Sequence, residues 1–333
     1  CFALQQTLKD LGHEVLVIDY KQPYIESTNR PFSWSIFRDK LLSPMSLFRY
    51  TKSIIHRLLS EKRFESFKKK FVSCTMPCTE TTIPQDFEAY LIGSDQVWSI
   101  DCTSKYDLVF WGQFKRKRNT KLFSYAISTN MKSLNTIRES SWNKILNEFN
   151  NLSFREKNTS DYIKHRTNRN VSVNIDPTLL LERNAWNRIL DSKIQDGKYI
   201  LVYQVRRIPG KENTLNNYAT QLASKMECKV VNLTYDYSPQ EFVSLFCYAT
   251  YVITSSFHGS VFGLIFNKPM SVVCLGDGHD DRYVNLLKSV GAESALMKIN
   301  EIFNEKTIDY ELVNKKLDKL RMDSLLYLKT ILQ

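Results

Sequence analysis

Residues 251–275 read YVITSSFHGSVFGLIFNKPMSVVCL, and this stretch decides the fold. An apolar run at 251–254 is too short for a helix and predicts a buried strand. Residues 258–266 carry apolar side chains at helical spacing, and a second apolar run follows at 270–275. A strand, a crossover helix and a second strand are typical of a parallel sheet.

The same alternation extends along the chain on both sides of this stretch. We predict strands at 89–92, 121–126, 152–155, 171–175, 199–205 and 229–233, with helices at 212–226 and 241–248. Alternation of this kind predicts an α/β fold with parallel sheets. A chain of 333 residues suits two domains. We expect an N-terminal Rossmann-like domain over residues 1–185 and a C-terminal one over 186–333, which would hold the donor site.

The first 80 residues fit this pattern less well. Leu4, Leu8 and Leu11 predict a helix that Gly12 ends, and residues 15–18 predict a short strand. We expect the strand that should precede this helix to be missing from the sequence. Residues of about 30–80 combine apolar and basic side chains at helical spacing, which predicts a basic helical insertion.

Composition narrows the function. The sequence contains no window of 18 apolar residues, which a membrane span would need, and no signal peptide at its start. We therefore expect a cytoplasmic protein. Seven scattered cysteines without a C-x-x-C pair argue against a disulfide framework or a zinc cluster. The net charge of +11 favours an anionic partner, either a phosphate-bearing substrate or the inner face of an anionic membrane, while a solvated basic surface is the alternative. No nucleic-acid-binding motif is present, so nucleic acid is not expected as a partner.

Ligands of α/β sheets bind beyond the carboxyl ends of the strands, where two polar segments first draw attention. Ser94 and Asp95 follow Gly93 at the end of the strand at 89–92. Asp95 could accept a proton from a sugar hydroxyl or could cap a turn. Arg155 ends the strand at 152–155 and could clamp a carboxylate or phosphate. Its alternative is a structural ion pair with Glu156 or with Asp176, which we expect to brace the inter-domain segment.

The segment after residue 254 is the most informative. Ser255 and Ser256 supply hydroxyls, His258 can exchange a proton near neutral pH, and Gly259 helps to open the helix. Backbone amides at a helix N-terminus attract anions. A capping serine beside a buried histidine is the alternative, but the convergence of these features favours an anion-binding site.

Several familiar motifs are absent from the sequence. It has no GxxxxGK[ST], GxGxxG, GxSxG or HExxH. The segment 276–281, GDGHDD, lacks the spacing of a calcium loop, and we expect it to be a loop near the site. No metal or cofactor is therefore expected.

Taken together, these segments resemble the polysaccharide pyruvyl transferase family. The resemblance rests on their order and spacing: Gly93 through Trp98, Ser153 through Glu156, Asp176-Pro177-Thr178, Ser255 through Gly259, Asn267-Lys268-Pro269, and Arg282 with Leu286 and Leu287. It implies two Rossmann-like domains facing a cleft, similar to the B-type glycosyltransferase fold. It also implies phosphoenolpyruvate as the donor and, as the acceptor, a sugar of a surface exopolysaccharide or its lipid-linked oligosaccharide precursor.

The resemblance assigns roles to three residues. His258 matches the histidine at the donor, Arg155 an arginine near the donor's charged groups, and Asp95 an aspartate on the acceptor side. Ser256 departs from the family, which often has an arginine two residues before the histidine. The missing charge then comes from Arg155, Arg206, Arg207 or Arg282, or the donor has changed.

Two other functions remain open at this point. A B-type glycosyltransferase would hold the diphosphate of a nucleotide sugar at His258. A non-catalytic module would bind anionic glycans through its basic surface. Only the pyruvyl transferase requires a phosphoenolpyruvate-dependent product, with His258 protonating the donor's methylene carbon and Asp95 accepting the hydroxyl proton.

Overall fold

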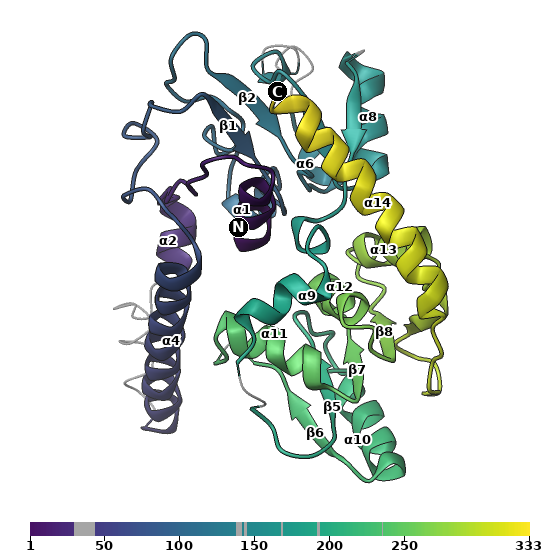
Figure 1. Cartoon of the computed structure of the whole chain (residues 1–333). Helices are drawn as coiled ribbons and strands as arrows, with labels where there is room; N and C mark the ends of the chain where they lie inside the picture. Colours follow the sequence, from purple (N-terminus) through teal and green to yellow (C-terminus); the bar gives the residue numbers. More distant parts are fainter. Residues whose placement is uncertain (30–43, 138–141, 143–144, 168, 192–193, 235) are drawn as a thin grey trace. The chain divides into compact units, whose positions relative to one another are not determined.

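The computed structural model describes the chain except for residues 30–43, 138–141, 143–144, 168, 192–193 and 235 (Figure 1). The described chain forms two compact units. Unit 1 consists of residues 1–55, 68–180 and 320–333, and unit 2 of residues 56–67 and 181–319. Residues 320–333, expected in the C-terminal domain, thus pack with unit 1.

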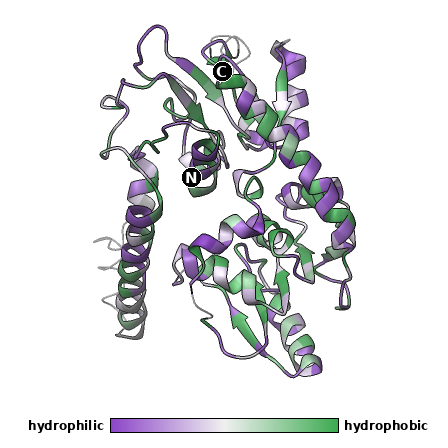
Figure 2. Cartoon of the chain, viewed as in Figure 1, coloured by the Kyte–Doolittle hydropathy of each residue, from purple (hydrophilic) through white to green (hydrophobic). Residues whose placement is uncertain are grey.

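Unit 2 is built on one five-stranded parallel sheet with the order β6-β5-β7-β8-β9. Its strands span Tyr199–Tyr203 (β5), Lys229–Asn232 (β6), Tyr251–Thr254 (β7), Met270–Cys274 (β8) and Leu296–Lys298 (β9). The central strands are apolar along their length (Figure 2). Alternate residues on both faces are buried, so helices must cover both faces. The predicted strand–helix–strand at 251–275 is confirmed.

The helices of unit 2 follow the strands. They span Arg183–Trp186 (α9), Thr214–Met226 (α10), Pro239–Tyr248 (α11), Phe257–Ile265 (α12) and Asp281–Val290 (α13), with 3-10 turns at Asn187–Ile189 and Glu293–Ala295. Ser238 caps α11 through a capping box with Glu241. Leu215 and Leu222 of α10 share a core with Ile200, Val202 and Ile253 on one face of the sheet. This core anchors β7, the strand that leads into α12.

Unit 1 contains two pairs of parallel strands. Ala89–Ile92 (β1) pairs with Lys121–Ser124 (β2), and Leu152–Phe154 (β3) pairs with Val171–Val173 (β4). Bridges from Phe123 to Asn151 and from Ile127 to Phe154 join the pairs. The core below them contains Trp98 stacked on Trp111, with ring centroids 3.9 Å apart. The short helices described in this unit include Phe2–Asp10 (α1), Pro23–Asn29 (α2), Ile100–Thr103 (α5), Met131–Asn135 (α6), Lys157–Thr167 (α8) and the 3-10 turn Pro177–Leu179 (η1).

The strand predicted at residues 15–18 is not formed. Only isolated bridges occur there, from Val17 to Cys74 and from Tyr20 to Cys78. The segment around these cysteines is irregular, so it offers no continuous ladder, and Leu16 is half exposed. The apolar run was correct as a pattern, but a strand also needs a regular neighbour.

Two long helices complete the chain. Pro44–Phe71 (α4) lies within the predicted basic insertion, of which residues 30–43 lie outside the described part. Tyr310–Ile331 (α14) begins in unit 2 and ends in unit 1. In the described part of the chain, no helix is long and apolar enough to cross a membrane. The α/β fold class with parallel sheets is confirmed, while the expected cleft remains a prediction.

Candidate functional site

The turn after β1 is shaped by Gly93. This residue has φ +138°, and a Cβ on it would lie 2.0 Å from the carbonyl oxygen of Tyr125. Glycine is therefore required where the chain leaves the strand. The Ser94 hydroxyl donates to the carbonyl of Ala126 at 2.7 Å, and Asp95 adopts φ 66°. The turn holds Asp95 outward, with 61% of its side chain exposed.

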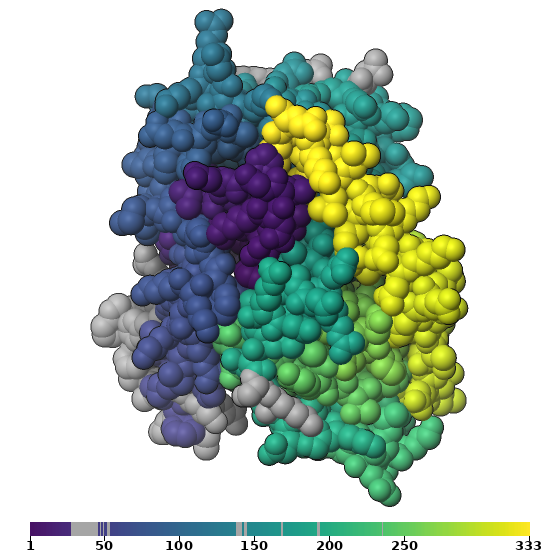
Figure 3. Space-filling model, in the orientation of Figure 1, coloured from purple at the N-terminus to yellow at the C-terminus, as the bar shows by residue number. Residues whose placement is uncertain are grey.

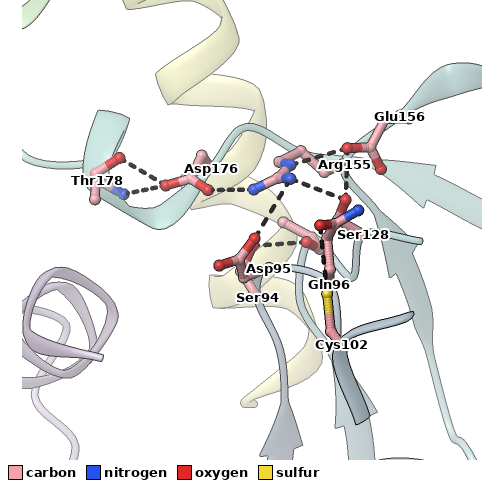
Figure 4. Close-up of polar contacts among 10 residues, drawn as sticks. Ser94, Asp95, Gln96, Cys102, Ser128, Arg155, Glu156, Asp176 and Thr178 are labelled. Atoms are coloured by element: carbon pink, nitrogen blue, oxygen red, sulfur yellow. Dashed lines mark hydrogen bonds and ion pairs between the residues drawn. The ribbon is translucent and has the colours of Figure 1, made fainter. Parts of the chain in front are cut away.

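Arg155 lies at the centre of an ion-pair cluster at the end of β3 (Figure 4). Its Nε contacts Glu156 Oε1 at 3.0 Å, and its Nη1 contacts Asp176 Oδ2 at 2.7 Å. Its Nη2 donates to Ser128 Oγ at 2.8 Å and lies 3.7 Å from Asp95 Oδ1. The arginine side chain is only 4% exposed, so its fork is occupied by protein groups.

The charges of this cluster stabilise the guanidinium. Burial lowers the pKa of Arg155, but Glu156, Asp176 and Asp95 together outweigh it and raise the pKa above its ordinary value. Three carboxylates surround one cation, and two of them are almost fully buried. Asp95 is the exposed member, which makes it the carboxylate available to a ligand.

The partners of Arg155 were only partly predictable. The ion pair with Asp176, the structural alternative for Arg155, is present. Asp176 also accepts from the amide and hydroxyl of Thr178, so it begins the turn η1. Ser128, which donates to Glu156 at 2.8 Å, was missed because nothing in its local sequence marks it.

The second polar cluster lies in unit 2, where β7 runs into α12. Ser256 is the N-cap of α12, and its hydroxyl accepts from the amide of Gly259. The Ser255 side chain is buried, and its Oγ has no hydrogen-bond partner within the described part of the chain. A buried hydroxyl without a partner costs about 1–3 kcal/mol, so this atom calls for an explanation.

His258 lies in the first turn of α12 and is half-buried. Its ring meets that of Phe257 edge to face, with centroids 5.3 Å apart. The N-terminus of a helix carries roughly half a positive charge, so an anion beside this ring would be favoured. Ser255, the N-cap and His258 thus combine a hydroxyl donor, a positive field and a titratable ring within one short segment.

Gly259 has a packing role as well. A Cβ on Gly259 would lie 2.1 Å from Thr254 Oγ1, so α12 is pressed against the end of β7. The glycine allows the helix to begin directly beside the strand that it follows.

Of the three arginines predicted in unit 2, Arg207 is exposed, and Arg206 and Arg282 differ in their surroundings. Arg206 contacts Asp277 at 2.5 Å and Asp280 at 3.1 Å. Its charge is thus largely matched by the loop at 276–280, whose acidic residues were weighed as metal ligands in the sequence. Arg282 lies half-buried in the first turn of α13.

Comparison with known proteins places the chain in a family. The fold is α/β, with an unpartnered buried hydroxyl at the start of α12 in unit 2 and an exposed carboxylate after β1 in unit 1. A model of the polysaccharide pyruvyl transferase family matches residues 1–273, and the chain belongs to that family. It is therefore a transferase of polysaccharide biosynthesis. No curated protein matches the chain significantly.

Two solved structures are similar at low identity. A functionally uncharacterized protein from Klebsiella pneumoniae is 13% identical, with 74% of this chain and 88% of that chain covered and a TM-score of 0.40. S. aureus MnaA, solved with UDP, is 12% identical, with 93% of this chain and 90% of that chain covered and a TM-score of 0.43.

Proposed function

We propose that this enzyme transfers the pyruvyl group of phosphoenolpyruvate to hydroxyls of a sugar in a surface polysaccharide or its lipid-linked precursor, forming a pyruvate ketal. Membership of the family supports a transferase with a polysaccharide acceptor. The observation that supports an anionic donor is the unpartnered, buried hydroxyl of Ser255 beside the start of α12.

An anionic donor would complete this segment. A phosphate or carboxylate oxygen that accepts from Ser255 removes the cost of its unpaired hydroxyl, and the helix N-terminus favours the same charge. Ser256 stands where family members often have an arginine, and its hydroxyl already serves as the cap of α12. Because Arg206 is matched by Asp277 and Asp280, we assign anion binding to the helix start and His258.

The proposed reaction balances without a further reactant. His258, as an imidazolium, protonates the methylene carbon of the donor, and a sugar hydroxyl adds to its C2 while losing a proton. Inorganic phosphate then leaves with a proton from a second hydroxyl, which adds to the same carbon and closes the ketal. General acid and base groups each contribute about 10²–10⁴-fold to such steps.

Asp95 is the candidate base for the acceptor hydroxyl. It is exposed and held by a glycine turn, whereas Glu156 and Asp176 are committed to Arg155. We assign Arg155 the role of a positioning residue that orients Asp95, in place of direct contact with the donor.

Binding of the donor can be tested by thermal unfolding. Phosphoenolpyruvate at 100 times its Kd should stabilise the protein by about 2.7 kcal/mol, and a nucleotide sugar should not. Ser255→Ala should leave the free protein as stable or more stable and reduce the stabilisation by phosphoenolpyruvate. Ser260→Ala, which removes a buried hydroxyl bonded to the Ser256 carbonyl, is the matched control and should keep donor binding.

Turnover is tested by mass spectrometry of lipid-linked oligosaccharides incubated with the enzyme and phosphoenolpyruvate. We expect a mass gain equal to pyruvate less one water, with acceptor-dependent release of phosphate. A product formed only from a nucleotide sugar would establish a glycosyltransferase. Saccharide binding without any product would establish a binding module.

A further inference from the structure

Helix α4 exposes a row of large apolar side chains. Phe48 is 64% exposed, Ile55 58%, and Leu58 and Leu59 50% each. The intervals from Phe48 to Ile55 and from Ile55 to Leu59 are seven and four residues, and Leu58 lies beside them. These spacings place the four residues on one face of a helix. This set is here called the apolar stripe.

The stripe continues into positive charge. Lys62 lies four residues after Leu58, and Lys69 lies seven residues after Lys62, so both follow the same face. Both lysines and the neighbouring Lys70 are exposed. Over its length, α4 has eight lysine or arginine residues and two glutamates, a formal charge of +6 out of +11 for the chain.

Two described contacts of α4 with the following chain use polar side chains beside the stripe. His56 Nδ1 lies 2.7 Å from Asp236 Oδ1, and Arg63 lies 3.7 Å from Glu241. His56 and Arg63 are seven residues apart and share a face that borders the stripe at Leu59, which lies three residues after His56 and four before Arg63. Side chains of α4 form part of the molecular surface in Figure 3. In these two contacts α4 is held by polar side chains, and the four residues of the stripe stay at least half exposed.

We propose that α4 docks on the surface of an anionic phospholipid bilayer. The apolar stripe would lie at the boundary between headgroups and acyl chains, and the lysines would contact the headgroups. A helix with an apolar face and basic flanks lies in the membrane interface, and anionic lipid attracts its charge. Self-association through the stripe would instead bring two helices of charge +6 together, which repulsion disfavours. The proposal does not rest on the donor or on the chemistry proposed above.

Vesicle flotation with the full chain tests the docking. The protein should float with vesicles containing phosphatidylglycerol and stay behind with phosphatidylcholine alone. Binding should weaken as salt rises, because salt screens exposed charges over about 10 Å at 0.1 M. Ile55→Ser/Leu58→Ser/Leu59→Ser should lower partitioning at least about ten-fold.

Matched variants on α14 serve as controls. Met322→Ser/Leu326→Ser alters two apolar side chains that are each 63% exposed and should not change partitioning. Lys62→Glu/Lys69→Glu/Lys70→Glu should lower partitioning at least about a hundred-fold, since each basic residue contributes about five-fold. Lys315→Glu/Lys319→Glu/Lys329→Glu makes the same change of net charge on exposed positions of α14 and should have the smaller effect.

The controls make the outcome decisive. Thermal unfolding checks that each variant folds. If the triple serine variant does not fold, the lysine-to-glutamate variants still test the docking. Equal partitioning of the α4 and α14 variants would overturn the proposal, as would failure of the parent protein to bind anionic vesicles. A dimer that the stripe variant dissociates, in a protein that binds no vesicles, would assign the stripe to a second copy.

Discussion

At the scale of single residues, His258 is the most direct test of the chemistry. Asparagine keeps a hydrogen-bond donor of similar size but cannot deliver a proton to carbon. We expect His258→Asn to bind phosphoenolpyruvate and to lose pyruvyl transfer by at least about 10²-fold in a phosphate-release assay. His279→Asn changes an exposed histidine of the loop at 276–280 and should leave the rate unchanged. Near-normal turnover of His258→Asn would eliminate the acid role.

Arg155 and Arg206 test whether a buried ion-pair cluster contributes more to the free energy of unfolding than a partly exposed one. Its removal leaves Glu156 and Asp176 buried without their cation, so Arg155→Ala should cost about 3–5 kcal/mol in the free energy of unfolding. Arg206 holds two carboxylates as well but is 24% exposed, so Arg206→Ala should cost about 1 kcal/mol or less. Urea denaturation measures both. If Arg155→Ala is as mild as Arg206→Ala but abolishes transfer, Arg155 acts on the substrate.

At the scale of elements, two glycines of α12 give a matched comparison. Alanine favours a helix over glycine by about 1 kcal/mol. At Gly263 the nearest atom to a new Cβ is Met270 Sδ, the movable end of a flexible chain. At Gly259 it is Thr254, a β-branched residue whose hydroxyl is already bonded to the Tyr203 carbonyl. Gly259→Ala should therefore lower the melting temperature more than Gly263→Ala, and the reverse order would contradict this packing.

The loop before α13 should make stability depend on acid. Burial raises the pKa of Asp280, but hydrogen bonds from Tyr283 and from the amide of Gly276, with Arg206 nearby, lower it overall. A carboxylate with a lowered pKa in the folded state adds stability above its unfolded pKa of about 3.9, and that stability is lost as pH falls through the folded pKa. Asp280→Asn should thus destabilise the protein more at pH 7 than at pH 3, as measured by urea denaturation. Equal loss at both values would show that the charge of Asp280 contributes nothing.

The pattern of apolar residues predicted the strands whose formation depends mainly on nearby sequence. Residues 251–254 and 270–274 formed strands because each apolar run is flanked on both faces by helices of the same βαβ alternation. The run at 15–18 failed because its neighbour is irregular. The strand-end positions of Asp95, Arg155 and His258 were predictable as well. The choice of partners was not, because Ser128 and Asp176 reach Arg155 through contacts distant in sequence.

At the scale of the whole molecule, the return of the chain to unit 1 could not be predicted. The amphipathic pattern of α14 predicts a helix but does not say which core it covers. The structure divides α14 at Leu320, and residues after it bond to unit 1. Ser324 Oγ accepts from the amide of Ile175, and Tyr327 donates to the carbonyl of Ser124. The last turns of the helix therefore belong to the core that supports Asp95 and Arg155.

Truncation after Lys319 tests this division. Leu328 is 0% exposed and Ile331 5%, and losing a buried aliphatic side chain typically costs about 2–5 kcal/mol. Together with the lost hydrogen bonds of Ser324 and Tyr327, this approaches the total stability of a domain, about 5–15 kcal/mol. We expect the truncated chain to lose hydrogen-exchange protection in β1 and β2 while β5 and β7 stay protected.

The control for this truncation removes only Leu332 and Gln333, which lie beyond the end of α14. It should keep the protection of all four strands, because the buried side chains of the last turns remain. If the longer truncation also leaves β1 and β2 protected, unit 1 is stable without residues 320–333. Its core then ends at Leu180, and the final turns of α14 cover a core that is complete without them.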